Sequence, residues 1–146
     1  MELRELMLIT IAVRPLVDLG GGRRYVAFDG GTFEGRDGMS GTVLEGGADW
    51  QTVRPDGILD IDAHYTLQTE ANEAIEVVSQ GVRKASASVT ARLAQGDQVG
   101  PDEYYFRTLV RLSTAAPRLS RLNDLIAVST GERERNTVRI HVHEVL

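Results

Sequence analysis

Alternating polar residues between positions 60 and 64 are the first feature of the sequence that can carry out chemistry. Asp60, Asp62 and His64 occupy every second position, so in an extended strand they share one face, with Cβ atoms about 7 Å apart. If that face lines the interior of a barrel, Asp62 can act as a general base and His64 as a proton shuttle, for enolisation, cyclisation or elimination. If it faces solvent, the alternation is ordinary for a half-buried strand. The pattern leaves both orientations open.

A second polar cluster surrounds the single tryptophan. Trp50 offers a flat surface for stacking a planar ligand, and the guanidinium of Arg54 can hold a carboxylate or an enolate through two parallel hydrogen bonds. Asp49 adds a carboxylate beside them, so all three are candidate ligand-binding residues. The alternative is a turn motif, in which Asp49 caps a loop, Trp50 anchors the core and Arg54 pairs with an aspartate.

The segment 104–112 supplies a cation and phenolic hydroxyls. Arg107 shares one face of an expected strand with Tyr105. A buried arginine needs an anionic partner, and Asp62 is the carboxylate that we pair with Arg107. Such a pair would either lock two strands together or form the floor of an anion-binding pocket, to which Tyr65 or Tyr105 adds a hydroxyl group.

Composition excludes several kinds of site. The chain has no cysteine, which rules out thiolate catalysis, disulfides, cysteine-ligated zinc and iron–sulfur clusters. His64, His141 and His143 would suffice for zinc or non-haem iron only if all three converged, and exposed strand positions are the commoner interpretation. Glycine-rich phosphate loops and the nucleophile elbow of hydrolases are also absent. We therefore expect neither a metal nor a cofactor.

Length and charge limit the protein class. A chain of 146 residues can bury a core without disulfides or metals, and we expect a single domain over residues 1–146. A net charge of −5 argues against nucleic-acid binding, which needs a basic surface. The apolar run 6–13 is too short to span a bilayer and follows acidic residues, so we expect no signal peptide, no membrane contact and a cytoplasmic location.

Glycine-rich turns divide the chain into short extended segments. Asp29-Gly30 and similar pairs tolerate positive φ and mark turns, the Gly20–Gly22 run suits a hairpin tip, and residues 132–135 suit a solvated charged turn. One short helix is expected at 86–95 and a helical turn at 118–122. Many strands without long helices predict an antiparallel sandwich or closed barrel. The expected strands are 6–13, 24–28, 39–44, 50–54, 58–69, 74–80, 104–112, 125–129 and 137–145.

Five sequence segments together form a recognisable pattern. They are 41–50 (GTVLEGGADW), 53–57 (VRPDG), 59–69, 104–108 (YYFRT) and Leu122-Asn123. In these segments the chain resembles the domain of unknown function 3237 family of small bacterial and fungal proteins. The resemblance implies an antiparallel β-barrel of calycin-like appearance, often a dimer, so we expect a homodimer. Asn123, as part of this pattern, joins the candidate ligand-binding residues.

Two functions remain open at this point. The first is a cofactor-independent isomerase, cyclase or lyase that acts on a carbonyl-bearing or aromatic metabolite inside the barrel; the second is a non-catalytic small-molecule carrier or sensor. An enzyme should leave a carboxylate or tyrosine unpaired beside open volume, whereas a carrier should have an apolar interior with its titratable groups paired. Asp62 and Arg107 on the outer surface would exclude the enzyme in this form. The candidate residues are Asp62, Tyr65, Tyr105 and Arg107 for catalysis, and Asp49, Trp50, Arg54 and Asn123 for ligand binding.

Overall fold

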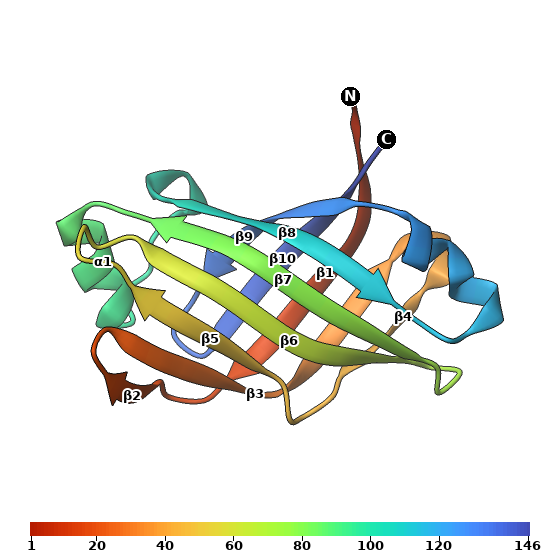
Figure 1. Cartoon of the computed structure of the whole chain (residues 1–146), viewed down its shortest axis with the longest axis horizontal. Coiled ribbons are helices and arrows are strands. Elements are labelled where there is room, and N and C mark those ends of the chain that lie inside the picture. Colours follow the sequence, from red (N-terminus) through yellow and green to blue (C-terminus); the bar gives the residue numbers. More distant parts are fainter.

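The alternation of apolar and polar residues becomes the inner and outer surface of a closed barrel (Figure 1). The computed structural model describes residues 1–146. The strands are β1 (Leu3–Val13), β2 (Val17–Gly20), β3 (Arg23–Gly35), β4 (Ser40–Val43), β5 (Ala48–Val53), β6 (Leu59–Thr69), β7 (Ala74–Lys84), β8 (Tyr105–Ser113), β9 (Ala127–Arg133) and β10 (Thr137–Val145). The helical segments are α1 (Ala87–Ala94) and the 3₁₀ helices η1 (Arg36–Gly38), η2 (Pro101–Glu103) and η3 (Pro117–Asp124).

All paired strands are antiparallel, and the sheet closes on itself. The order round the barrel is β1, β10, β9, β8, β7, β6, then β4 and β5, then β3, which pairs again with β1. β4 and β5 follow one another in the gap between β3 and β6, so the barrel has eight strand positions. The short β2 pairs only with β3. The expected all-β antiparallel barrel is confirmed.

The interior of the barrel is mostly apolar through its middle, apart from the buried, mutually hydrogen-bonded hydroxyls of Ser79, Thr108 and Ser129. On β6, Ile61, Ala63, Tyr65 and Leu67 are buried, and the residues between them face outward. The same alternation runs along β8 and β10. Burying an aliphatic or aromatic side chain of this kind stabilises the fold by about 1.5–3 kcal/mol. The side chains packed in the centre therefore contribute much of the stability of the barrel.

Helical segments cover the two ends of the barrel. Figure 1 shows α1 at one end and the blue turns of η3 at the other. The side chain of Ser86 caps α1 by accepting a hydrogen bond from the backbone N–H of Val89, and Leu93 is buried. The predicted short helix is therefore confirmed. No helix of the structure combines the length and hydrophobicity needed to cross a membrane.

β3 is longer than the sequence predicts, because the expected turn at Asp29-Gly30 is wrong. Gly30 and Gly31 have φ of 110° and 145°, and they bend the strand rather than end it. A Cβ atom on Gly31 would lie 2.1 Å from the carbonyl oxygen of Thr10 on β1. Glycine at this position therefore lets β3 pass close to β1 and close the barrel.

β9 also runs further than predicted. Glu132 and Arg133, expected in a solvated turn, continue this strand, and Arg133 pairs with Val138 on β10. The alternation along β9 carries Ala127, Ser129 and Arg133 toward the interior. A charged residue at the end of β9 therefore belongs to the barrel mouth.

Candidate functional site

A pocket of about 240 Å³ lies at the α1 end of the barrel. Phe28 from β3, Ile61 from β6 and Phe106 from β8 form much of its apolar wall, and Leu93 of α1 contributes to its edge. Small-molecule sites usually measure about 300–1,000 Å³. This pocket therefore suits a small metabolite with an apolar framework.

Three half-buried arginines line the pocket, to which the exposed Arg135 adds a fourth. Arg24 stands near the start of β3, Arg83 near the end of β7, and Arg133 at the end of β9. In an antiparallel barrel these strand ends meet at the same rim, which explains why residues far apart in sequence share one pocket. None of the three takes part in an ion pair.

Burial lowers the pKa of all three guanidinium groups. The effect is largest for Arg83, whose pKa falls to about 10, with repulsion from Arg24 and Arg133 as further causes. A pKa of about 10 still leaves this group protonated at neutral pH. The pocket therefore concentrates positive charge that no carboxylate of the chain neutralises by direct contact.

Asp49 is the carboxylate that lines this pocket. Its Oδ2 accepts a hydrogen bond of 2.7 Å from Nε2 of Gln51, and its Oδ1 accepts one of 3.1 Å from the backbone N–H of Asp62. Burial raises the pKa of Asp49, although both hydrogen bonds act in the opposite direction. A buried, oriented carboxyl group with a raised pKa has the properties of a general base or acid.

Gln51 connects this carboxylate to the arginine cluster. The amide oxygen of Gln51 accepts a hydrogen bond of 2.8 Å from Nε of Arg24, while the amide nitrogen donates to Asp49. Because one amide makes both contacts, its orientation is determined. Gln51 is buried, so water competes little for these hydrogen bonds.

Tyr65 lies inside the barrel with a buried hydroxyl group that has no hydrogen-bond partner. Its ring meets Phe28 edge to face, with 5.2 Å between the ring centroids. Burial raises the pKa of Tyr65, and the nearby charge of Asp49 raises it further. The hydroxyl therefore stays protonated and is available only as a hydrogen-bond donor or acceptor.

The structure corrects the predicted interior pair of Asp62 and Arg107. Asp62 is about half exposed (49%), and its Oδ1 contacts Nε2 of His64 at 3.2 Å and Nε2 of Gln80 at 3.0 Å. Arg107 is exposed and lies over the ring of Tyr105, 5.0 Å from its centroid. β6 and β8 bury their apolar faces, so these residues face outward. The acid–base arrangement expected around them inside the barrel is not formed.

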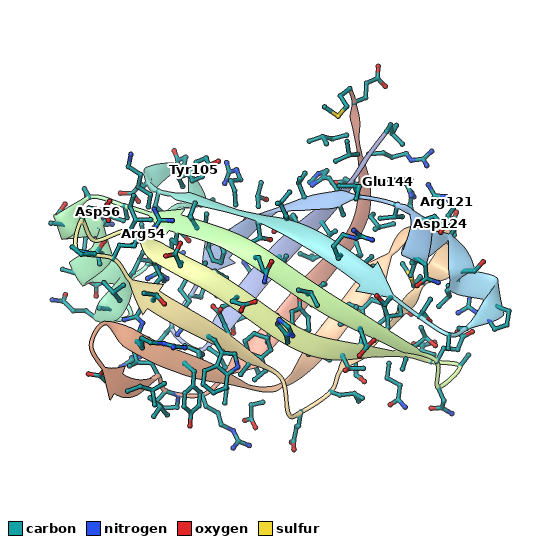
Figure 2. All side chains as sticks on the ribbon, in the orientation of Figure 1. Arg54, Asp56, Tyr105, Arg121, Asp124 and Glu144 are labelled. Atoms are coloured by element: carbon teal, nitrogen blue, oxygen red, sulfur yellow. The ribbon has the colours of Figure 1, made fainter.

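The remaining predicted residues also lie outside the pocket. Trp50 stacks on Tyr25 at the outer surface, with 4.7 Å between the ring centroids. Arg54 forms a bidentate ion pair with Asp60, at 2.9 and 2.6 Å, and Figure 2 shows it at the α1 end, in the turn that also holds Asp56. This pair is the turn-like alternative that the sequence left open.

Asn123 sits in η3, at the end of the barrel opposite α1. Its side chain joins both backbone groups of Thr114, through hydrogen bonds of 2.8 and 3.0 Å. Of the histidines, His141 lies 3.4 Å from Glu132, and no three histidine, aspartate or glutamate residues are grouped as metal ligands. Among the predicted site residues, Asp49 and Tyr65 are thus buried in the barrel, and only Asp49 lines the pocket at the α1 end.

Sequence reasoning missed the arginines and Gln51. On β7, Arg83 continues the inward series of Ile75 and Val77 at every second position, and Arg24 likewise precedes Val26 by two. This parity is a usable signal, because residues two apart on a strand share a face. Gln51 carries no such signal, because it is adjacent to Trp50 and residue type alone favours the tryptophan as the buried one of the two.

Comparisons with known proteins extend over the whole chain. The family model described as "Protein of unknown function (DUF3237)" matches residues 1–145. A UPF0311 protein of Rhodopseudomonas palustris is 31% identical over 150 residues, which cover 100% of this chain and 97% of the relative. A UPF0311 protein of Clostridium acetobutylicum is 29% identical, with 99% and 94% covered.

Solved structures share the barrel. A conserved protein of unknown function from R. palustris has a TM-score of 0.95 at 32% identity, covering 99% of this chain and 97% of that one. A β-barrel-like protein from Acinetobacter baumannii has a TM-score of 0.84 at 34% identity, covering 98% and 94%. An enzyme from Penicillium herquei shares the fold, with a TM-score of 0.70 at 21% identity and 99% and 94% covered. The chain belongs to the DUF3237 family of proteins of unknown function.

Proposed function

We propose that the protein is a cofactor-independent isomerase, cyclase or lyase that moves a proton on a small carbonyl-bearing or aromatic metabolite bound at the α1 end of its barrel. The observation that carries the proposal is the state of Asp49. This carboxylate is buried, lines open volume and has no ion-pair partner, and its pKa is raised by burial. Perturbed carboxyl groups in pockets are typical of proton-transfer sites.

The roles follow from what each group can do. Asp49 takes a proton from a C–H group next to a carbonyl or from a phenolic O–H, and the electron pair left behind forms an enolate or phenolate. Arg24, Arg83 and Arg133 stabilise that negative charge through their N–H groups. Return of the proton to a different atom gives isomerisation, and loss of a leaving group gives elimination. In cyclisation the enolate or phenolate first adds to an electrophilic double-bond carbon of the same molecule, which forms the ring bond, and the proton returns to the atom that receives the displaced electron pair. No external oxidant or reductant is needed.

A carrier or sensor is the second candidate. The apolar wall around Phe28 and Phe106 suits either function. A carrier gains nothing from an unpaired carboxylate in its binding site, because burying a charge without a partner is costly. Asp49 therefore favours catalysis, and the fungal barrel, an enzyme from Penicillium herquei, agrees with a catalytic use of this fold.

The test identifies the ligand and its chemistry together. The purified protein is incubated with a bacterial metabolite extract in D₂O, separated from unbound material, and the retained and released metabolites are analysed by mass spectrometry. We expect one small metabolite to be retained and to gain deuterium on carbon, or to be converted. Asp49→Asn should keep the ligand and lose the exchange, whereas Arg107→Ala on the outer surface should change neither.

Retention without exchange or conversion by the unmodified protein would support the carrier, and retention of nothing would reject the proposal. The expected cytoplasmic location and homodimeric state belong to the same proposal. Cell fractionation tests the first, and light scattering of the purified protein tests the second.

A further inference from the structure

The charge balance of the pocket goes beyond what a single enolate requires. The lining residues carry four positive charges, on Arg24, Arg83, Arg133 and the exposed Arg135, against one negative charge, on Asp49. Three positive charges are left over, and the guanidinium groups of Arg24, Arg83 and Arg133 are partly removed from water. Leaving buried charges unpaired destabilises a folded protein, so such an excess has a structural cost without a ligand.

This imbalance is specific to the pocket. Six arginines of the chain are half-buried: Arg24, Arg36, Arg83, Arg92, Arg133 and Arg139. Three of them have carboxylate partners: Arg36 contacts Glu144, Arg92 contacts Glu103, and Arg139 contacts Glu132 and Glu134. The other three, Arg24, Arg83 and Arg133, have no carboxylate partner and all line the pocket. The chain therefore neutralises its half-buried arginines everywhere else.

The unpaired guanidinium groups also have free donors. Arg83 makes no side-chain hydrogen bond within the chain, and Arg24 uses only its Nε, toward Gln51. Arg133 makes one long contact, 3.5 Å to the carbonyl oxygen of Arg135. Its backbone is held in place, because its N–H donates to the hydroxyl of Tyr104 at 2.8 Å. Each arginine can thus present a fork of N–H groups to an anion.

We propose that the ligand of this pocket is a small dianion, with two negative charges on a compact apolar or aromatic framework. The inference rests on the proposed function in one respect, that the pocket at the α1 end is the binding site. Because the arginines come from three different strands, they surround the ligand rather than contact it from one side. Phe28 and Phe106 then pack against the framework between the charged groups.

Isothermal titration calorimetry with matched probes tests the proposal. Phthalate carries two carboxylates on a benzene ring, monomethyl phthalate keeps the shape with one charge removed, and phenyl phosphate carries its two charges on a single group. Phthalate or phenyl phosphate should bind at least about tenfold more tightly than monomethyl phthalate, since loss of a charge-assisted hydrogen bond lowers affinity by about that factor or more. Whichever dianion binds more tightly identifies a dicarboxylate or a phosphate ester as the natural group.

Arg83→Gln provides the decisive variant. It should weaken binding of the tighter dianion by about tenfold or more and affect monomethyl phthalate less. Loss of an unpaired buried cation should also raise the melting temperature of the ligand-free variant, which separates lost binding from lost folding. Arg107→Gln, at an exposed arginine of β8, should leave affinity unchanged.

Equal affinity for phthalate and its monomethyl ester would overturn the dianion, and so would full affinity for both dianions in Arg83→Gln. If no probe binds while a monoanionic or neutral metabolite is retained from the extract, the dianion is wrong and the proposed function stands. If neither the probes nor the extract yield a ligand, both the dianion and the proposed function are wrong.

Discussion

The amide nitrogen of Gln51 lies 2.7 Å from Oδ2 of Asp49 and is the only side-chain donor to that carboxylate. The oxygen of the same amide accepts the Nε hydrogen bond of Arg24. One buried side chain thus orients both a cation suited to anchoring a ligand and a carboxylate suited to moving its proton. Changes at Gln51 should therefore alter chemistry more than folding.

The first prediction concerns the pKa of Asp49. Gln51→Leu removes a hydrogen bond that lowers this pKa, so the pKa should rise further above its usual range. A general base works in its deprotonated form, and the rising limb of the pH–rate profile should move to higher pH. Deuterium exchange of the bound metabolite, measured against pH, checks this.

Gln80→Leu is the matched control for Gln51. Gln80 makes the equivalent amide-to-carboxylate hydrogen bond with Asp62, at 3.0 Å on the outer surface. Its removal should leave the pH profile unchanged. An equal shift in both variants would show that Asp49 is not the titrating base.

The second prediction concerns the buried hydroxyl of Tyr65. Because this hydroxyl has no partner, Tyr65→Phe should raise the free energy of unfolding by about 1 kcal/mol, the lower end of the desolvation cost of an unsatisfied polar group. Tyr104→Phe removes a hydroxyl that accepts the N–H of Arg133, and it should lower the same quantity by about 1 kcal/mol.

Urea denaturation of both tyrosine variants gives the comparison. The free energy of unfolding should rise in Tyr65→Phe and fall in Tyr104→Phe, although both substitutions delete a tyrosine hydroxyl. Changes of opposite sign would exclude an effect common to the loss of any hydroxyl. Destabilisation of equal size in both variants would mean that the hydroxyl of Tyr65 is satisfied within the protein.

The third prediction concerns the end of the barrel opposite α1. Glu144 is buried and contacts Arg4 at 3.1 Å, Arg36 at 2.9 Å, and Arg121, and Figure 2 shows Glu144 and Arg121 close together. The hydrogen bond from Arg36 is the main cause that lowers the pKa of Glu144. Glu144→Gln should reduce the free energy of unfolding at pH 7 by about 2 kcal/mol.

The pH dependence follows from the direction of that shift. A carboxyl group whose pKa is depressed by folding stabilises the native state above its unfolded pKa, about 4.3, and the contribution disappears as pH falls through the folded value. The difference between the native protein and Glu144→Gln should therefore shrink between pH 5 and pH 3, measured by urea denaturation. A constant difference would contradict the ion cluster. Glu134→Gln, which removes an exposed ion pair with Arg139, should reduce the free energy of unfolding by less than Glu144→Gln does at neutral pH.

Local pattern was sufficient for much of the architecture. The alternation along β6 and the capped segment before Gly96 predict a strand and a helix whose ends differ from the structure by at most one residue. Gly31 shows the limit of such patterns. A glycine that permits a turn equally permits a strand to bend against Thr10, and the contact that decides between them comes from a distant segment.

The candidate site likewise combines features that residue spacing predicts with features that only strand pairing decides. The sequence by itself determined an antiparallel all-β fold, the shared apolar face of Ile61 and Tyr65, and the absence of thiol chemistry, because these follow from residue type and spacing. Only the tertiary structure decided that Trp50 faces outward, where it stacks on Tyr25, and that its neighbour Asp49 faces inward. The physical reason is that antiparallel pairing brings the ends of β3, β7 and β9 to one rim, and the charges gathered there are separated in sequence by up to a hundred residues or so.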